Sequence, residues 1–385
     1  MASMPTQRLL SIDVLRGITI AFMIMVNNNG GPGSWHFMNH AVWNGLTPTD
    51  LVFPTFVFVV GASVVFATEA RLARGATRAH LAWHTFRRAV ILFALGVVVN
   101  SFPFFELVHM RFYGVLQRIA VCYLVVGLFY LWDKRAGTKA AVAAVLLVGY
   151  WVMLRWIRVP GAGVPGRDFP FMDMTQNMVS WVDRLLMPHH LYLYAPDHNV
   201  RDPEGLLSDI PAVGTALIGM VTGLWLRRSK SAQAKALGLA AGSVACLAVG
   251  YLWSLWFPLN KNMWTSSFVL VAAGWSLAVL TLAYWVVELR GWGKGPGKRL
   301  LWPWLVFGSN AIVAYMVSEL LASGLDSIRF TADGHETDVT GYVFDLVFAH
   351  IPNPGWAAFA FSVSFTAVCF IPVWVLYRKK IFVKV

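Results

Sequence analysis

Charged side chains are scarce in this sequence of 385 residues. Asp, Glu, Lys and Arg together make up 13% of it, whereas hydrophobic residue types make up 57%. Soluble globular domains carry charge on about a quarter of their residues. A water-soluble protein of this length cannot bury so much apolar surface. The composition therefore excludes a soluble domain and indicates an integral membrane protein.

Cysteine is also rare, and several familiar signatures are missing. The three cysteines lie far apart in separate apolar runs, at Cys122, Cys246 and Cys369. This pattern excludes a disulfide framework and a cysteine metal cluster. Neither a Walker loop nor a dinucleotide-binding glycine fingerprint is present, and His189, His190 and His198 match no zinc spacing. We therefore expect no metal cofactor.

Long apolar runs dominate what the chain does contain. A helix that crosses about 30 Å of hydrocarbon needs about 20 mostly apolar residues. Ten such runs occupy residues 9–28, 51–69, 86–102, 112–132, 138–157, 206–226, 234–257, 265–288, 302–323 and 355–377. They predict an all-α fold, a polytopic transmembrane bundle of about ten helices, in which residues 1–385 form a single integral membrane domain. The first run lacks the basic flank of a secretory signal, so we expect it to remain as a helix.

The basic residues fall mainly in alternate connections between these runs. Because cytoplasmic loops are enriched in Lys and Arg, the alternation predicts that both termini are cytoplasmic. The net charge of +12 then belongs to loops beside anionic lipid, and we expect no nucleic-acid partner. Three extended segments, 29–50, 158–205 and 324–354, are predicted to be non-cytoplasmic.

Polar and aromatic residues are concentrated in NNNGGPGSWHFMNHAVWNGLTPTDLVFP, residues 27–54. Turn formation explains the Asn and Gly residues at its start. His40 and Asn44, flanked by aromatic residues, fit a mostly apolar pocket with a few polar groups. Asp50 either orients His40 or caps the next helix, because it directly precedes an apolar run.

Six segments, in this order along the chain, resemble the heparan-α-glucosaminide N-acetyltransferase family. They are SIDVLRG (11–17), HAVWNGLTPTDLVFP (40–54), GVLQRIAVCY (114–123), DPEGLLSDIPAVGTALIGMVTG (202–223), LNKNMWTSSFVLVAAG (259–274) and GSNAIVAYMVSEL (308–320). The resemblance covers residues from about 8 to 380. The chain is similar to the shorter bacterial relatives, which implies a bacterial cytoplasmic membrane.

This resemblance implies the transfer of an acetyl group from cytoplasmic acetyl-CoA to a glucosamine amine on the far side of the membrane. His40 matches the family's reactive histidine, and Asn27 matches an asparagine near the end of the preceding helix. Imidazole suits proton removal near neutral pH. His40 either takes the proton of the amine or itself carries the acetyl group. Asn27 or Asn44 is expected to donate to the developing oxyanion.

Other polar residues are candidates for substrate or CoA binding. Asp13 and Arg16 share a helix face at spacing i,i+3, and they either form an ion pair or line a polar cavity. Arg118 lies inside a predicted helix, where a charge needs a partner. That partner is either a phosphate or pantetheine group of CoA, or a carboxylate of Asp13, Glu106 or Glu319.

Two further groups complete the candidate site. Asp202 and Glu204 precede the sixth predicted helix, where they either cap it or contact the acceptor. Glu319 is expected to form a polar stripe inside the bundle with Asn310, Tyr315 and Ser318.

The favoured hypothesis is a transmembrane acetyltransferase that uses acetyl-CoA, an amino-sugar acceptor and surrounding lipid. A homodimer fits the resemblance. The alternative is a sugar or amino-sugar transporter in which His40, Arg118 and Glu319 line a path. No inverted internal repeat is evident, which disfavours the transporter. A third hypothesis is an assembly partner of other membrane enzymes.

Overall fold

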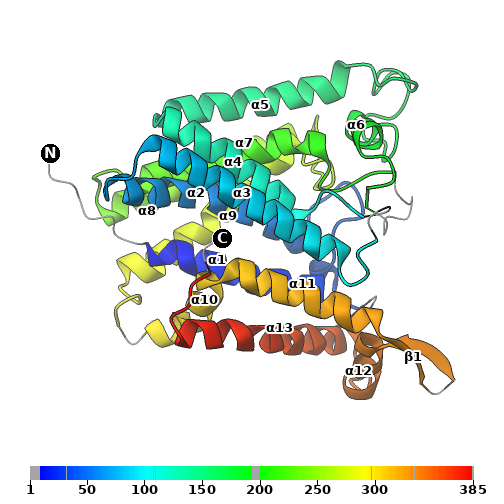
Figure 1. Ribbon diagram of the computed structural model, residues 1–385. Helices are drawn as coiled ribbons and strands as arrows, with labels where there is room; N and C mark the ends of the chain where they lie inside the picture. Colours follow the sequence, from blue (N-terminus) through cyan, green and yellow to red (C-terminus); the bar gives the residue numbers. More distant parts are fainter. Residues whose placement is uncertain are drawn as a thin grey trace.

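The computed structural model describes residues 9–31, 33–106, 108, 110–192, 200–295, 297–332 and 334–383. Over these residues the chain forms a bundle of long helices (Figure 1). Within them, nine helices are long and apolar enough to cross a membrane, or ten if one bent pair counts as a single span. The predicted helical bundle is confirmed at this level.

Nine of the ten predicted runs each overlap one long helix of the described residues. These helices are α1 (Leu10–Asn27), α2 (Val52–Leu72), α3 (Arg78–Ser101), α4 (Val115–Trp132), α5 (Ala136–Trp156), α7 (Asp209–Leu226), α8 (Ala232–Trp253), α9 (Ser266–Tyr284) and α13 (Pro354–Arg378). Short 3-10 turns precede α2 (Pro48–Leu51) and α7 (Leu206–Ser208), and a π turn (Trp285–Leu289) extends α9. Helix α3 begins earlier than predicted because the Thr77 side chain caps it by accepting from the His80 amide.

The predicted helix 302–323 is wrong as a single helix. It is divided into α10 (Lys298–Ser309) and α11 (Ala311–Ser327), which meet at 74° around Asn310. The Asn310 side chain donates to the Ile381 carbonyl oxygen at 3.1 Å and accepts from the Val383 amide at 2.8 Å. Asn310 therefore joins the break to the chain after α13. Of the expected stripe, Tyr315 and Ser318 are buried in α11.

The segments outside the bundle contain structure that the sequence did not predict. They hold α6 (Met178–Leu186), the antiparallel strands β1 (Arg329–Ala332) and β2 (His335–Asp338), and α12 (Val339–Val347). In Figure 1, α6, β1 and α12 lie toward the same end of the molecule. The fold is thus mainly helical with one short hairpin.

The helices form an inner and an outer set. Most of α1, α2 and α7 is buried by other helices, whereas less than a third of α3, α5, α8 and α13 is buried. Apolar side chains on the outer set, such as Val145, Leu237 and Ile371, are exposed in the isolated chain. In a bilayer these faces meet lipid tails, and the inner helices carry the polar groups.

Close backbone contact joins α2 to α7 at two glycines. A Cβ atom added at Gly61 lies 1.8 Å from the Ala216 carbonyl oxygen, and one at Gly219 lies 1.9 Å from that of Phe58. Membrane helices use small residues at interfaces because packing, rather than the hydrophobic effect, drives their association. These two glycines fix the distance between the helices that begin near Asp50 and at Asp209.

Replacing Gly61 with Ala is expected to destabilise the bundle by about 1–3 kcal/mol, because the added methyl group forces α2 away from α7. The measurement is the Tm of detergent-purified protein. Gly149→Ala is the control, since that glycine lies on α5 with nothing within 4 Å of an added Cβ. Equal Tm values for the two variants contradict the proposed contact.

Candidate active site

His40 lies between α1 and α2, and Asp50 orients its ring. The His40 Nδ1 atom is 2.7 Å from Asp50 Oδ1, and 47% of the His40 side chain is exposed, whereas the Asp50 side chain is fully buried. The Asp50 carboxylate accepts a hydrogen bond from Nδ1–H, which leaves the lone pair of the neutral ring on Nε2. His40 therefore presents a proton acceptor on the open side of the ring.

Asp50 makes both of the contacts that the sequence left as alternatives. Its Oδ2 atom accepts hydrogen bonds from the Thr47 amide at 3.0 Å and from the Ala41 amide at 3.1 Å. Thr47 and Asp50 also form a capping box at the 3-10 turn that leads into α2. The same carboxylate caps this turn and holds His40.

Lys261 faces the other edge of His40, and sequence reasoning missed it. Its Nζ atom lies 3.1 Å from Nε2 and 3.3 Å from Nδ1 of His40. One signal was present, because Lys261 is the only Lys in the connections predicted to be non-cytoplasmic. The ammonium donates toward the Nε2 lone pair, the atom that would react.

Backbone and side-chain bonds hold these two segments together. The Gly45 amide donates to the Leu259 carbonyl oxygen at 2.9 Å, and Asn260 Nδ2 donates to Asn44 Oδ1 at 3.1 Å. Two of the sequence segments that carry the family resemblance, 40–54 and 259–274, therefore meet at His40. Asn44 lies within this junction.

The surroundings keep His40 uncharged over a wider pH range. Partial burial lowers the pKa of His40 below its ordinary value, and the Lys261 ammonium lowers that pKa further, whereas Asp50 and Glu204 act in the opposite direction. Burial also lowers the pKa of Lys261, against the opposing effect of Glu204 and Asp50. Both shifts favour the uncharged forms of His40 and Lys261.

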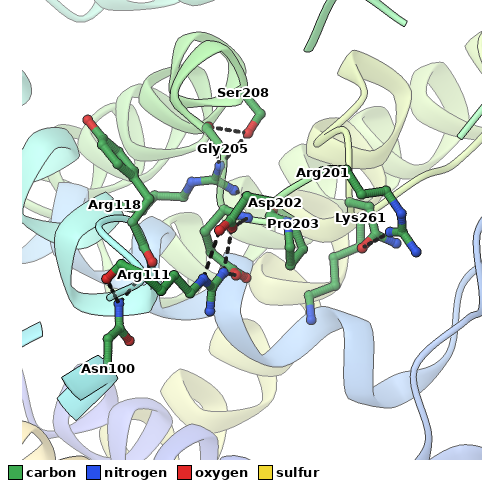
Figure 2. Close-up of polar contacts among 12 residues, drawn as sticks. Asn100, Arg111, Arg118, Arg201, Asp202, Pro203, Gly205, Ser208 and Lys261 are labelled. Carbon is green, nitrogen blue, oxygen red and sulfur yellow. Dashed lines mark hydrogen bonds and ion pairs between the residues drawn. The ribbon is translucent and has the colours of Figure 1, made fainter. Parts of the chain in front are cut away.

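Asp202 and Glu204 share one cation, Arg111. Figure 2 shows Arg111 reaching the segment that contains Asp202, with Lys261 also in view. Arg111 Nε donates to Asp202 Oδ2 at 2.8 Å, and Nη2 also contacts Asp202 and Glu204. Burial alone would raise the pKa of Glu204, but Arg111 and Lys261 outweigh it and lower that pKa, so Glu204 is a carboxylate.

Arg118 is fully buried and has an internal partner that the sequence did not suggest. Its Nε atom donates to Asp209 Oδ1 at 2.9 Å, and Nη2 donates to the Gly205 carbonyl oxygen at 3.0 Å (Figure 2). The guanidinium also lies 4.8 Å from the centre of the Trp264 ring. The expected carboxylate partners Asp13, Glu106 and Glu319 were wrong. Arg118 lies in the first turn of α4, near the start of the helix.

Asp183 adds a carboxyl group that the sequence analysis did not identify. Its Oδ1 atom accepts from the Leu206 amide at 2.9 Å, and its buried Oδ2 atom has no partner among the described residues. Burial, with repulsion from Asp202, raises the pKa of Asp183 to about 7. A buried carboxyl group with a raised pKa therefore lies beneath the Asp202–Gly205 turn.

The remaining candidates lie in two other places. Asn27, the last residue of α1, donates to Glu319 Oε1 at 3.0 Å. At the other end of α1, roughly 20 Å away along the helix, Arg16 pairs with Asp13 at 3.2 Å and donates to Ser63. Asp13 and Arg16 therefore lie apart from His40.

His198 is outside the described residues, and none of the described residues form a group suited to hold a metal ion.

Comparisons with known proteins identify the family of the chain. A family model described as "Heparan-alpha-glucosaminide N-acetyltransferase, catalytic" matches residues 8–259, more than half of the chain. A mouse protein named heparan-alpha-glucosaminide N-acetyltransferase is 28% identical over 427 aligned residues, and its human counterpart is 29% identical over 434.

These two alignments cover 98% of this chain, but the chain spans only 60% of the length of either relative. The matched region contains His40, Asp50, Arg111, Arg118 and Glu204, and it ends two residues before Lys261. The sequence resemblance is thereby confirmed, and the chain belongs to the heparan-alpha-glucosaminide N-acetyltransferase family.

Proposed function

We propose that this protein is a transmembrane acetyltransferase that moves acetyl from acetyl-CoA to the amine of glucosamine or a related amino sugar. The observation that carries the proposal is His40, whose ring is oriented by buried Asp50 and whose Nε2 atom faces Lys261. Membership of the family supports the choice of donor and acceptor.

In the direct route, His40 acts as the general base. The acceptor nitrogen attacks the thioester carbonyl carbon, and Nε2 of His40 takes the proton that the nitrogen loses. The carbon–sulfur bond then breaks, and the proton passes from His40 to the departing thiolate, which leaves as CoA. The bond from Nδ1 to Asp50 stabilises the imidazolium that forms between these steps.

In the two-step route, the same lone pair forms a covalent bond. Nε2 attacks the thioester carbonyl carbon, the carbon–sulfur bond breaks, and CoA leaves as its thiolate while the acetyl group rests on His40. The amine then attacks the acetyl carbon, the bond to Nε2 breaks, and the proton that the amine loses balances the one taken up by the thiolate. Both routes need a neutral His40 with Nε2 free of a proton, and the lowered pKa of His40 favours that state.

Lys261 is the group best placed to stabilise negative charge on the thioester oxygen. Its ammonium lies 3.1 Å from the Nε2 atom, and we infer that it turns toward the thioester oxygen when substrate occupies the space beside Nε2. Asn44 lies in the same junction, where its Oδ1 atom accepts from Asn260, and its side-chain NH2 group is proposed as a second donor. Asn27 donates to Glu319, so we assign it to the wall of the site.

The carboxylates of Asp202 and Glu204 are proposed to contact the acceptor. Glu204 is close enough to His40 and Lys261 to affect the pKa of both groups. Sugar hydroxyl and amino groups donate hydrogen bonds to carboxylates. Arg111 holds both carboxylates in position and leaves Glu204 charged.

The donor is proposed to enter from the opposite end of the bundle. Arg16 and Asp13 lie on α1 at that end, and Arg16 also contacts the Gly308 carbonyl oxygen near Asn310. These residues are assigned to the cytoplasmic route of acetyl-CoA, and Arg118, with its internal partners, to the support of the acceptor side. Both termini are placed in the cytoplasm, and a homodimer in the membrane is proposed.

His40→Ala is expected to lower the rate of acetyl transfer from acetyl-CoA to glucosamine by at least about 100-fold, the scale of a lost general base. Free CoA thiol and acetylated product are both quantified with detergent-purified protein. His36→Ala is the control, since it is an exposed histidine in the same segment.

The same assay separates the alternatives. Radiolabelled acetyl retained on acid-quenched wild type but not on His40→Ala, without acceptor, identifies the two-step route. A His40→Ala rate within about threefold of wild type would falsify the role of His40. If wild type neither binds nor consumes acetyl-CoA, the transporter hypothesis takes first place.

Lys261→Met is expected to move the acid limb of the pH–rate profile to higher pH. Activity needs neutral His40, and the wild-type limb lies below the ordinary histidine pKa of 6.5 because burial and Lys261 lower the pKa of His40. Removing the ammonium lets that pKa rise, so more alkaline solution is needed. Lys261→Arg keeps the charge and the position of the limb. An unchanged limb in Lys261→Met excludes an electrostatic effect of Lys261 on His40.

Cysteine labelling tests the proposed orientation. Val42 is 84% exposed beside His40, and Ala73 is exposed in the turn after α2. In a background without native cysteines, Val42→Cys should react with an impermeant maleimide on intact cells. Ala73→Cys should react only after permeabilisation. The reverse pattern means that the protein lies the other way round.

A further inference from the structure

A hollow of about 420 Å³ opens at the corner where α2 ends and α3 begins. It is lined by Arg71, Arg74, Gly75, Ala76, His80 and His84. Helix α2 starts two residues after Asp50 and ends at Leu72, beside the hollow. The length of this helix separates the hollow from Asp50 by roughly 30 Å. The hollow is therefore separate from the candidate active site.

Within the part of the chain that the structure describes, no carboxylate pairs with Arg71 or Arg74. Residues 70–105 contain no Asp or Glu. The nearest acid in sequence, Glu69, is already engaged, because it pairs with Lys134 at 2.6 Å and with Arg227 at 3.4 Å. An anion from outside the chain is the natural counter-charge.

Among the described residues, the arginines that line the hollow form hydrogen bonds to a histidine ring and a backbone carbonyl group. Arg71 Nη1 donates to His84 Nδ1 at 3.0 Å, and Arg74 Nε donates to the Ala70 carbonyl oxygen at 3.0 Å. Behind them, the guanidinium of Arg88 lies over the Tyr123 ring, and its buried Nε atom has no partner in the described part of the chain. Guanidinium groups with spare donors match the oxygens of a phosphate group.

Aromatic residues place the corner at the level of lipid headgroups. Trp83 and Phe86 stack at 5.6 Å on α3 and are 63% and 46% exposed. Exposed aromatic side chains at the end of a membrane helix gather at the membrane–water interface. Trp83 directly precedes His84, so the hollow opens where the phosphate groups of lipids lie.

We propose that the α2–α3 corner binds the phosphate headgroup of an anionic phospholipid. Arg71 and Arg74 contact the phosphate oxygens from the hollow, and His80 and His84 line its wall. The acyl chains lie along the exposed face of α3 beside Trp83 and Phe86. This site is independent of the proposed acetyl transfer.

Binding of a soluble short-chain lipid tests the proposal. Purified protein in an uncharged detergent is titrated with dioctanoylphosphatidylglycerol or dioctanoylphosphatidylcholine, and the rise in Tm gives the apparent Kd. Wild type should bind the anionic phosphatidylglycerol at least about tenfold more tightly than the zwitterionic phosphatidylcholine. Arg71→Gln/Arg74→Gln should lose roughly tenfold or more of that affinity, since each basic residue near the membrane contributes on the order of fivefold.

Lys379→Gln/Lys380→Gln is the matched control, because it removes the same charge from exposed residues of the same predicted face. Arg74→Gln alone, at an exposed position, serves if the double variant does not fold, with about a fivefold loss expected. Unchanged affinity in the arginine variants, or an equal loss in the lysine control, overturns the site. Titrations with CoA and inorganic phosphate complete the test. If CoA or inorganic phosphate raises the Tm of wild type but not of Arg71→Gln/Arg74→Gln, and phosphatidylglycerol raises neither, the lipid assignment is wrong. The ligand is then a soluble phosphate.

Discussion

A charged group removed from water needs partners, and the site depends on how Arg118 finds them. Its side chain is fully buried and bonds to Asp209 and to the Gly205 backbone, while Trp264 covers the guanidinium. Breaking a buried pair of this kind costs about 3–5 kcal/mol. The pair therefore fixes the segment before α7 against α4 and α9. Glu204 lies in this segment, and Lys261 lies in the connection that leads into α9, so both are kept near His40.

The lengths of the apolar runs predicted most of the long helices. The break at Asn310 was not predicted, because no proline marks it and because the Asn310 side chain is satisfied by Ile381 and Val383, about seventy residues further along the chain. The start of α3 depended on a local cap at Thr77, which the apolar pattern does not reveal. Long-range and polar contacts were thus the missing information.

The candidate site shows the same division. His40 and Asp50 are ten residues apart, so a local pattern identified both, and the structure shows them in contact. Lys261 was missed because it reaches His40 only through tertiary packing. The predicted partners of Arg118 were wrong for the same reason, since its actual partner, Asp209, comes from a different helix. Motifs identified the segments, whereas the ion pairs between them required the fold.

His40 and Lys261 are 221 residues apart in the chain, and the junction of residues 44–45 with residues 259–260 brings them together. During synthesis, the first seven long helices can enter the bilayer before this junction exists. The reacting centre is therefore assembled late in biogenesis, when the connection before α9 reaches the loop after α1. An incompletely inserted chain therefore carries His40 without the cation that faces it.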